Sequence, residues 1–270
     1  MKNNNFYYNK ISKQSIEYYN KYGFIVIKKF FKEKKIVSIR KEILKKIKKN
    51  ENDFFYYEKI KKNNFLRRIE KVTDFSIQAK KILLSKKIFN FLELLEKKKF
   101  VLFKDKLNFK YPGSKGFLPH IDGHFFWKDR KNKYQNGWYK YSNNFINLVV
   151  PLEKSDLQNG CIYLSKKRDT QKLGKDFKSI TKKLLINTPN LKKEDVNNFK
   201  FYPIILKKGD LCIFNWKCAH FSKKNNSNKS RMILYSTYSQ KNSTKDVRKS
   251  YYFDKLKSKS NSKNKSLLFN

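Results

Sequence analysis

The sequence predicts a mainly β protein, a sandwich or barrel with helices packed outside it. Short runs rich in β-branched and aromatic residues follow one another between about residues 100 and 240. Pro-Gly, Asn-Gly and Gly-Asp pairs separate these runs, as expected of turns between short strands. The stretch over about 12–97 shows apolar residues at helical spacing instead, so we expect a largely helical N-terminal scaffold.

The clearest element of this scaffold is an amphipathic helix. Ile36, Ile39, Ile43 and Ile47 recur at helical spacing in a Lys-rich stretch, which predicts one apolar face and one solvated face. The first eleven residues are expected to be loose, and residues 50–73 show a mixed pattern. The predicted elements are a short helix over 12–21, a strand over 22–27, the amphipathic helix over 32–49 and two helices within 75–97.

The barrel is expected to span about 100–240. A polar, partly helical insertion at 166–198 interrupts it and is a candidate cover for one end of the barrel. We treat 1–254 as a single domain, and the tail 255–270, rich in Lys, Ser and Asn, is predicted to be disordered. The predicted strands are 101–111, 145–152, 161–164, 201–206, 211–214 and 231–238.

The formal net charge of +43 is extreme, but the sequence does not favour nucleic-acid binding. Seven of the 65 basic residues are Arg, which leaves 58 Lys spread along the whole chain. Proteins that read nucleic acid usually gather Arg on one face, because Arg makes bidentate contacts that Lys cannot. Lys, Asn, Ile, Phe and Tyr are all written with A/T-rich codons, so a biased genome accounts for the composition. The positive field is still expected to attract anionic substrates.

The cysteines and the short apolar runs indicate in which cellular compartment the protein works. Cys161, Cys212 and Cys218 are odd in number and form no C-x-x-C pair, which fits free buried thiols in a reducing compartment. The first ten residues carry no apolar signal region, and no apolar run approaches the roughly 20 residues of a membrane span. We therefore expect a cytoplasmic protein with no membrane partner, and we leave its oligomeric state open.

Two histidines and one aspartate form the motif with the most chemical content. His120 and Asp122 lie two residues apart after a strand-like segment, so both side chains can project to the same face. His220 follows another strand-like run, and Arg231 comes eleven residues later. Two His and one carboxylate are the protein ligands of many non-haem Fe(II) oxygenases, in which three coordination positions stay open. The motif therefore predicts such a metal centre.

The order and spacing of several motifs resemble those of the phytanoyl-CoA dioxygenase family of Fe(II)/2-oxoglutarate oxygenases. The likeness covers about residues 15–240. The family's fold is a double-stranded β-helix, a jelly-roll or cupin-like barrel with helices outside, which agrees with the strand pattern above. The segments that carry the resemblance are Y-G-F-I-V-I-K-K-F-F (22–31), K-L-N-F-K (106–110), H-I-D-G-H-F-F-W (120–127), N-G-C-I-Y-L (159–164), G-D-L-C-I-F-N-W-K-C-A-H (209–220) and R-M-I-L-Y (231–235).

The resemblance implies roles for five residues. His120, Asp122 and His220 match the family's iron ligands. Arg231 matches the residue that pairs with the distal carboxylate of 2-oxoglutarate. A guanidinium group can donate two parallel hydrogen bonds to a carboxylate, whereas the ammonium group of Lys acts as a point charge. Lys106 lies on a strand where the family tends to have a basic residue near the cosubstrate. The implied cofactors are Fe(II), 2-oxoglutarate and O2, and the implied reaction hydroxylates a C–H bond and releases succinate and CO2.

The sequence departs from the family pattern at two places. Ile121 stands where the family often has Gln, which removes a polar contact near the cosubstrate. S-K-K-R-D over 165–169 replaces the usual P-G-S-H, which changes one loop at the mouth of the site. Asp122 is kept, whereas halogenating relatives have a small residue there, so hydroxylation is favoured.

The expected substrate is a small anionic or zwitterionic metabolite, because aromatic and cationic residues gather around the motif. His124 and Trp127 are the substrate-facing candidates. His124 could also bind the metal, but Gly123 before it indicates that the strand has already ended. Further candidates, each better explained as barrel core or solvated charge, are Phe125, Phe126, Trp138, Trp216, Lys115 and Arg130.

Three other interpretations stay open at this point. The protein could be a 2-oxoglutarate oxygenase that acts on nucleic acid or on protein; the nucleic-acid form predicts salt-dependent binding to oligonucleotides. It could be a barrel that binds a ligand without turnover, which predicts no succinate formation. It could also be a cupin-like metalloenzyme that does not use 2-oxoglutarate, in which case activity would not need Arg231.

Overall fold

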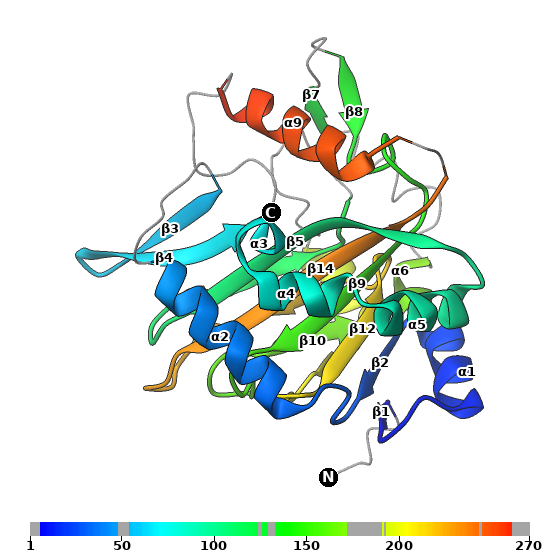
Figure 1. Ribbon diagram of the computed structural model, residues 1–270, viewed down its shortest axis with the longest axis horizontal. Helices are drawn as coiled ribbons and strands as arrows, with labels where there is room; N and C mark the ends of the chain where they lie inside the picture. Colours follow the sequence, from blue (N-terminus) through cyan, green and yellow to red (C-terminus); the bar gives the residue numbers. More distant parts are fainter. Residues whose placement is uncertain are drawn as a thin grey trace.

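Two sheets form the body of the protein, and helices cover the outside of the larger one (Figure 1). The computed structural model describes residues 6–47, 54–123, 126–128, 133–171, 191, 193–242 and 245–260. Its helices are α1 (Lys13–Tyr22), α2 (Glu33–Ile47), α3 (Val72–Phe75), α4 (Ile77–Leu83), α5 (Lys86–Glu96), α6 (Lys167–Gln171), α8 (Lys193–Asn197) and α9 (Val247–Ser260).

The larger sheet has eight strands and the smaller sheet has four. Along the larger sheet the order is β1 (Tyr7–Tyr8), β2 (Phe24–Ile27), β12 (Leu211–Asn215), β9 (Phe145–Pro151), β14 (Arg231–Gln240), β5 (Phe100–Lys110), β4 (Asn63–Glu70) and β3 (Phe55–Ile60). The smaller sheet runs β11 (Phe201–Pro203), β10 (Ile162–Ser165), β13 (His220–Ser222) and β6 (Phe117–His120). A separate hairpin joins β7 (Phe126–Lys128) to β8 (Tyr134–Asn136). The predicted mainly β, jelly-roll class is confirmed.

Strand alternation decides which side chains enter the barrel. On β14, Met232 and Leu234 face outward and pack in the large apolar core beneath the helices. The residues between them, Ile233 and Tyr235, face inward toward the smaller sheet. In Figure 1, α2, α4 and α5 lie across the outer face of the larger sheet, and their apolar side chains, such as Ile39 of α2, complete this core. The predicted apolar face of the amphipathic helix is therefore the face that packs on the sheet.

The N-terminal half holds a hairpin that the sequence analysis missed. Residues 50–73 show a mixed pattern in the sequence, and in the structure β3 and β4 form an antiparallel pair that extends the larger sheet beyond β5. Arg68 on β4 pairs with Asn108 on β5, and Glu70 pairs with Lys106. The hairpin matters for function because it adds two charged side chains to the interior of the barrel.

The predicted start of disorder at Lys255 is wrong. Helix α9 continues to Ser260, and Lys255 is buried with its Nζ 2.5 Å from Glu70 of β4. Arg248 of the same helix forms a second ion pair, with Asp105 of β5 at 2.5 Å. The Lys-rich composition of this segment predicted disorder, because the sequence alone does not show that Lys255 and Arg248 pair with the distant carboxylates of Glu70 and Asp105. Residues 261–270 lie outside the described part of the chain.

The structure describes the predicted insertion at 166–198 only at its two ends, as α6 and α8, so its role as a cover of the barrel stays a prediction. None of the helices among the described residues has the length and apolar character that crossing a bilayer requires.

Candidate metal centre

Three side chains from three parts of the barrel converge on one point. One ligand atom from each of His120, Asp122 and His220 lies within 4.8 Å of the others. His220 Nε2 and Asp122 Oδ2 lie 3.8 Å apart. All three residues are buried. A cluster of two imidazoles and one carboxylate at this spacing has the donor set and dimensions of a site for a divalent transition metal.

Adjacent strands of the smaller sheet bring the histidines together. His120 ends β6, His220 begins β13, and the two are direct cross-strand partners in the antiparallel ladder. Asp122 lies in the turn just after β6, not on the strand itself, so strand parity alone does not explain its position. The turn is completed by Gly123, whose φ of +78° is a left-handed conformation that favours glycine. Ile121 faces away and packs with Phe199, as the alternation predicted.

Hydrogen bonds fix the orientation of both imidazole rings. His120 Nδ1 lies 2.7 Å from the carbonyl oxygen of Leu118, and His220 Nδ1 lies 3.1 Å from that of Cys218. A carbonyl oxygen only accepts, so Nδ1 carries the proton in each ring. The Nε2 lone pair of each ring is therefore available to a metal ion.

The protonation states of the cluster also suit a metal. Burial lowers the pKa of His120 to about 3, with help from His220, and burial lowers the pKa of His220 as well. Burial alone would raise the pKa of Asp122, but His220 and the cations Lys104 and Lys106 hold it at about 2. At neutral pH the site therefore offers two neutral imidazoles and one carboxylate, the forms that bind metal.

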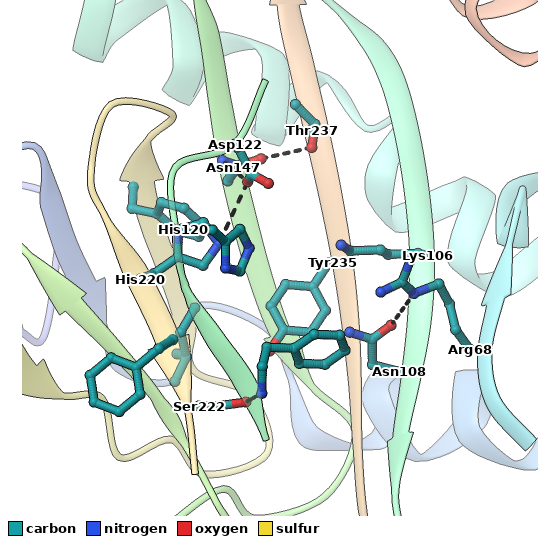
Figure 2. A pocket seen from close by; sticks show the side chains of 14 residues that line it. Arg68, Lys106, Asn108, His120, Asp122, Asn147, His220, Ser222, Tyr235 and Thr237 are labelled. Atoms are coloured by element: carbon teal, nitrogen blue, oxygen red, sulfur yellow. Dashed lines mark hydrogen bonds and ion pairs between the residues drawn. The ribbon is translucent and has the colours of Figure 1, made fainter. Parts of the chain in front are cut away.

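A short relay of hydrogen bonds holds the aspartate. Asn147 of β9 donates from Nδ2 to Asp122 Oδ2 at 2.9 Å, and Thr237 of β14 donates from Oγ1 to Asn147 Oδ1 at 2.7 Å. Both bonds are drawn in Figure 2. Through this relay the larger sheet orients a ligand that the smaller sheet carries.

A cavity opens beside the cluster, with the histidines on one wall and cations on the other (Figure 2). On the cationic wall, Arg68 donates from Nε to Asn108 Oδ1 at 3.3 Å, and Lys106 projects toward Tyr235. Burial lowers the pKa of Lys106 to about 8, and Arg68 adds to this effect. Apolar side chains complete the lining, namely Phe117, Ile162, Phe214 and Phe221.

Arg231 is buried but does not line this cavity. It lies on the same inward face of β14 as Tyr235, four residues away, and donates from Nη1 to the Gly160 carbonyl oxygen at 2.8 Å. Its cross-strand partner is Lys110 of β5, which is also buried. Burial and the neighbouring charge of Arg231 together lower the pKa of Lys110 to about 6. Neither cation makes an ion pair within the described chain, and Nε of Arg231 has no hydrogen-bond partner there.

The substrate-facing candidates are placed as follows. His124, Phe125 and Arg130 lie outside the described residues, and the side chains of Phe126 and Trp127 on β7 are not described. Trp138 and Trp216 are buried in an aromatic cluster with Phe103, as the interpretation as core anticipated. Lys115 is exposed.

Several residues at the site escaped the sequence analysis. Arg68 and Glu70 sit on the hairpin that had no recognisable pattern. Asn147 and Thr237 occupy inward positions of predicted strands, and a polar residue at such a position is the signal that could have found them. Lys104 and Lys110 share parity with Lys106 on β5, but in a chain with 58 Lys no lysine stands out.

Comparison with known proteins agrees with this geometry. The family model "Phytanoyl-CoA dioxygenase (PhyH)" matches residues 19–233. A 2-aminoethylphosphonate dioxygenase from the uncultured bacterium HF130_AEPn_1 is 29% identical over 70% of this chain and 64% of its own length. A methylphosphonate hydroxylase from Gimesia maris is 23% identical over 92% of this chain and 88% of its own.

Solved structures show the same fold at low sequence identity. EctD from S. alaskensis, crystallised with 2-oxoglutarate and 5-hydroxyectoine, matches 85% of this chain and 76% of its own with a TM-score of 0.65 at 13% identity. The epimerase SnoN, crystallised with Fe3+, alpha ketoglutarate and nogalamycin RO, matches 83% of this chain and 82% of its own with a TM-score of 0.61, also at 13% identity.

The fold and the cluster of two histidines and an aspartate define a non-haem Fe(II)- and 2-oxoglutarate-dependent dioxygenase. The chain belongs to the phytanoyl-CoA dioxygenase family, whose members use Fe(II), 2-oxoglutarate and O2.

Proposed function

We propose that this protein hydroxylates a C–H bond of a small anionic metabolite, such as an organophosphonate, and forms succinate and CO2 from 2-oxoglutarate. The observation that carries the proposal is the buried cluster of His120, Asp122 and His220 beside a cavity with a cationic wall. The phosphonate-processing activities named for two relatives support the choice of substrate class. We place the reaction in the cytoplasm, as the sequence analysis expects.

The iron ligands of the proposed enzyme are His120, Asp122 and His220. The donor set fits Fe(II), since both rings present neutral Nε2 atoms and the aspartate is held ionised. Bound Fe(II), together with 2-oxoglutarate and O2, supplies the oxidising power that the side chains lack. The protein orients the ligands through the backbone carbonyls and through Asn147, and its apolar lining keeps water from the reacting groups.

Arg231 and Lys106 are proposed to bind 2-oxoglutarate. The guanidinium of Arg231 is buried without a carboxylate partner in the described chain, and such a charge is strongly disfavoured unless an anion joins it. Lys110 lies beside it as a second basic group, whose Nζ donates to Gly160, Ser222 and Lys223 and whose charged form a bound carboxylate would favour. Lys106 and its neighbour Arg68 line the cavity between Arg231 and the metal cluster and would contact the cosubstrate nearer its keto acid end.

Succinate formation tests the proposal directly. Purified protein is loaded with Fe(II) and 2-oxoglutarate without oxygen, then exposed to O2 with each of a panel of phosphonates, carboxylates and neutral analogues. We expect succinate release that depends on an anionic compound and yields its hydroxylated product. Stimulation by neutral compounds alone would contradict the substrate class, and the absence of succinate under every condition would contradict the function.

A further inference from the structure

Lys104 is a buried amine that is in direct contact with no carboxylate among the described residues. It lies on the inward face of β5, two residues before Lys106, with 4% of its surface exposed. Its Nζ makes no hydrogen bond or ion pair with the described chain. Instead it lies 4.0 Å from the ring centroid of Trp138 and 5.9 Å from that of Tyr251. Aromatic rings compensate only part of the lost hydration of an ammonium group.

The carboxylates near Lys104 are already engaged. Glu70 is held by Lys255 at 2.5 Å and by Arg68 at 3.7 Å. Asp122 accepts from Asn147 and faces the two histidines of the metal cluster. Burial lowers the pKa of Lys104 to about 7, and Lys106 contributes, while Asp122 and Glu70 act in the opposite direction without contacting Lys104. The charge of Lys104 therefore remains available to an incoming anion.

Its position is next to the aspartate of the metal centre. Across the β5–β14 ladder Lys104 pairs with Thr237, which starts the relay to Asp122. The ring of Trp138 packs against the turn that carries Asp122, since a Cβ on Gly123 would lie 3.1 Å from it. Lys106 and Thr237, the neighbours of Lys104 on the inward faces of β5 and β14, line the cavity beside the metal cluster, and Lys104 lies directly behind this lining.

A second cationic position lies at the opposite end of the same face. Lys110 follows Lys104 by six residues, about 20 Å of extended strand, and its Nζ donates to Ser222 at 2.8 Å. The two ammonium groups face different partners, so one small dicarboxylate does not serve both. With Arg231 and Lys110 proposed for the cosubstrate, Lys104 is left for another anion.

We propose that Lys104 binds the anionic head group of the substrate, a phosphonate or a carboxylate, on the Asp122 side of the metal centre. This assignment rests on the function proposed above and names the residue that would select its substrate class. An ammonium is a point charge, so it serves either head group. A neutral molecule gains nothing from it.

Binding without turnover tests this role. Protein loaded with Fe(II) and 2-oxoglutarate is titrated calorimetrically, without oxygen, with methylphosphonate, acetate and the neutral acetamide. The variants are Lys104→Met, which removes the charge at similar length, Lys104→Arg, which keeps it, and Lys99→Met, which removes an exposed charge just before β5. We expect Lys104→Met to weaken binding of an anion about ten- to one-hundredfold. Lys104→Arg and Lys99→Met should stay within a few-fold of the unaltered protein.

Equal affinity of Lys104→Met and the unaltered protein would overturn the inference, as would failure of the unaltered protein to bind either anion. Iron content, 2-oxoglutarate affinity and succinate formed without substrate are measured on the same samples. If these are normal while Lys104→Met binds anions normally, only this inference fails. If the unaltered protein binds no 2-oxoglutarate, the proposed function fails first.

Labelling of the unaltered protein covers the case in which Lys104→Met does not fold. Cyanate, itself a small anion, carbamylates neutral lysine amines, and mass spectrometry reads each site. Methylphosphonate should slow carbamylation of Lys104 several-fold and leave that of Lys99 unchanged. Equal labelling of Lys104 with and without methylphosphonate would count against the assignment.

Discussion

His120 and His220 face each other across the β6–β13 ladder with ring centroids 4.2 Å apart, although a hundred residues separate them in the chain. Because they are direct cross-strand partners, the spacing of their Nε2 atoms is set by the sheet itself. Asp122 reaches the same point from a turn and needs the Asn147 relay to hold it. The centre thus combines two ligands fixed by backbone pairing with one fixed by side chains.

Removal of the aspartate should abolish metal binding. Asp122→Ala takes away the anionic ligand and leaves two neutral imidazoles, so we expect at least about a one-hundredfold loss of Fe(II) affinity and no detectable succinate. Metal analysis after dialysis against Fe(II), with succinate formation beside it, measures both. Chelation of the unaltered protein should abolish activity and added Fe(II) should restore it; Asp122→Ala with full iron content would contradict the assignment.

The relay to the aspartate gives a graded prediction. Thr237→Val removes the donor to Asn147 at nearly constant volume, while Thr237→Ser keeps the hydroxyl. We expect Thr237→Val and Asn147→Leu to weaken Fe(II) binding about ten- to one-hundredfold and Thr237→Ser to retain most of it. Competition with a chelator reports the affinity. Equal losses in Thr237→Val and Thr237→Ser would show that packing of the methyl group, not the hydrogen bond, matters.

The cosubstrate assignment predicts a separation between kinetic constants. Arg231→Lys keeps a positive charge but cannot donate two parallel hydrogen bonds to one carboxylate. The KM for 2-oxoglutarate should therefore rise roughly tenfold or more, with little change in Fe(II) affinity. Lys110→Met should raise the same KM by a smaller factor. An unchanged KM in Arg231→Ala would favour a metalloenzyme that does not use 2-oxoglutarate.

The Glu70–Lys255 pair makes the C-terminal helix part of the stable fold. A chain ending at Asp254 leaves Glu70 buried without its closest partner, so we expect a loss of about 3–5 kcal/mol in the free energy of unfolding. Denaturant titration at neutral pH measures this loss. A truncated protein as stable as the full chain would restore the interpretation of residues 255–260 as a loose tail.

The same pair has a defined pH dependence. Burial alone would raise the pKa of Glu70, but Lys255 and Arg68 lower it below its ordinary value. A carboxyl group whose pKa is lower in the folded state binds more protons when unfolded, so its contribution is complete above the unfolded pKa of about 4.3. We expect that contribution to fade as the pH falls below that value. Glu70→Gln should remove this part of the acid dependence, as equilibrium unfolding at several pH values would show.

Much of the barrel could be predicted because β5, β9, β12 and β14 are rich in β-branched and aromatic residues and turn residues lie between these runs. The convergence of His120 with His220 required a register that no local pattern encodes. The β3–β4 hairpin escaped because polar and charged residues interrupt its apolar ones, and two of these, Arg68 and Glu70, serve the barrel interior. Helix α9 escaped because its binding to the barrel rests on pairs such as Arg248 with Asp105, which connect residues far apart in sequence.

On the inward face of β5, Lys106 repels Lys104, and Arg231 repels Lys110 at the other end of the same face, whenever the barrel holds no anion. Any anion that fits between them should therefore raise the melting temperature, because a ligand that binds only the folded state stabilises it in proportion to RT ln(1 + [L]/Kd). A thermal-shift screen of anionic metabolites, run on protein saturated with 2-oxoglutarate, would then rank candidate substrates without any knowledge of the product.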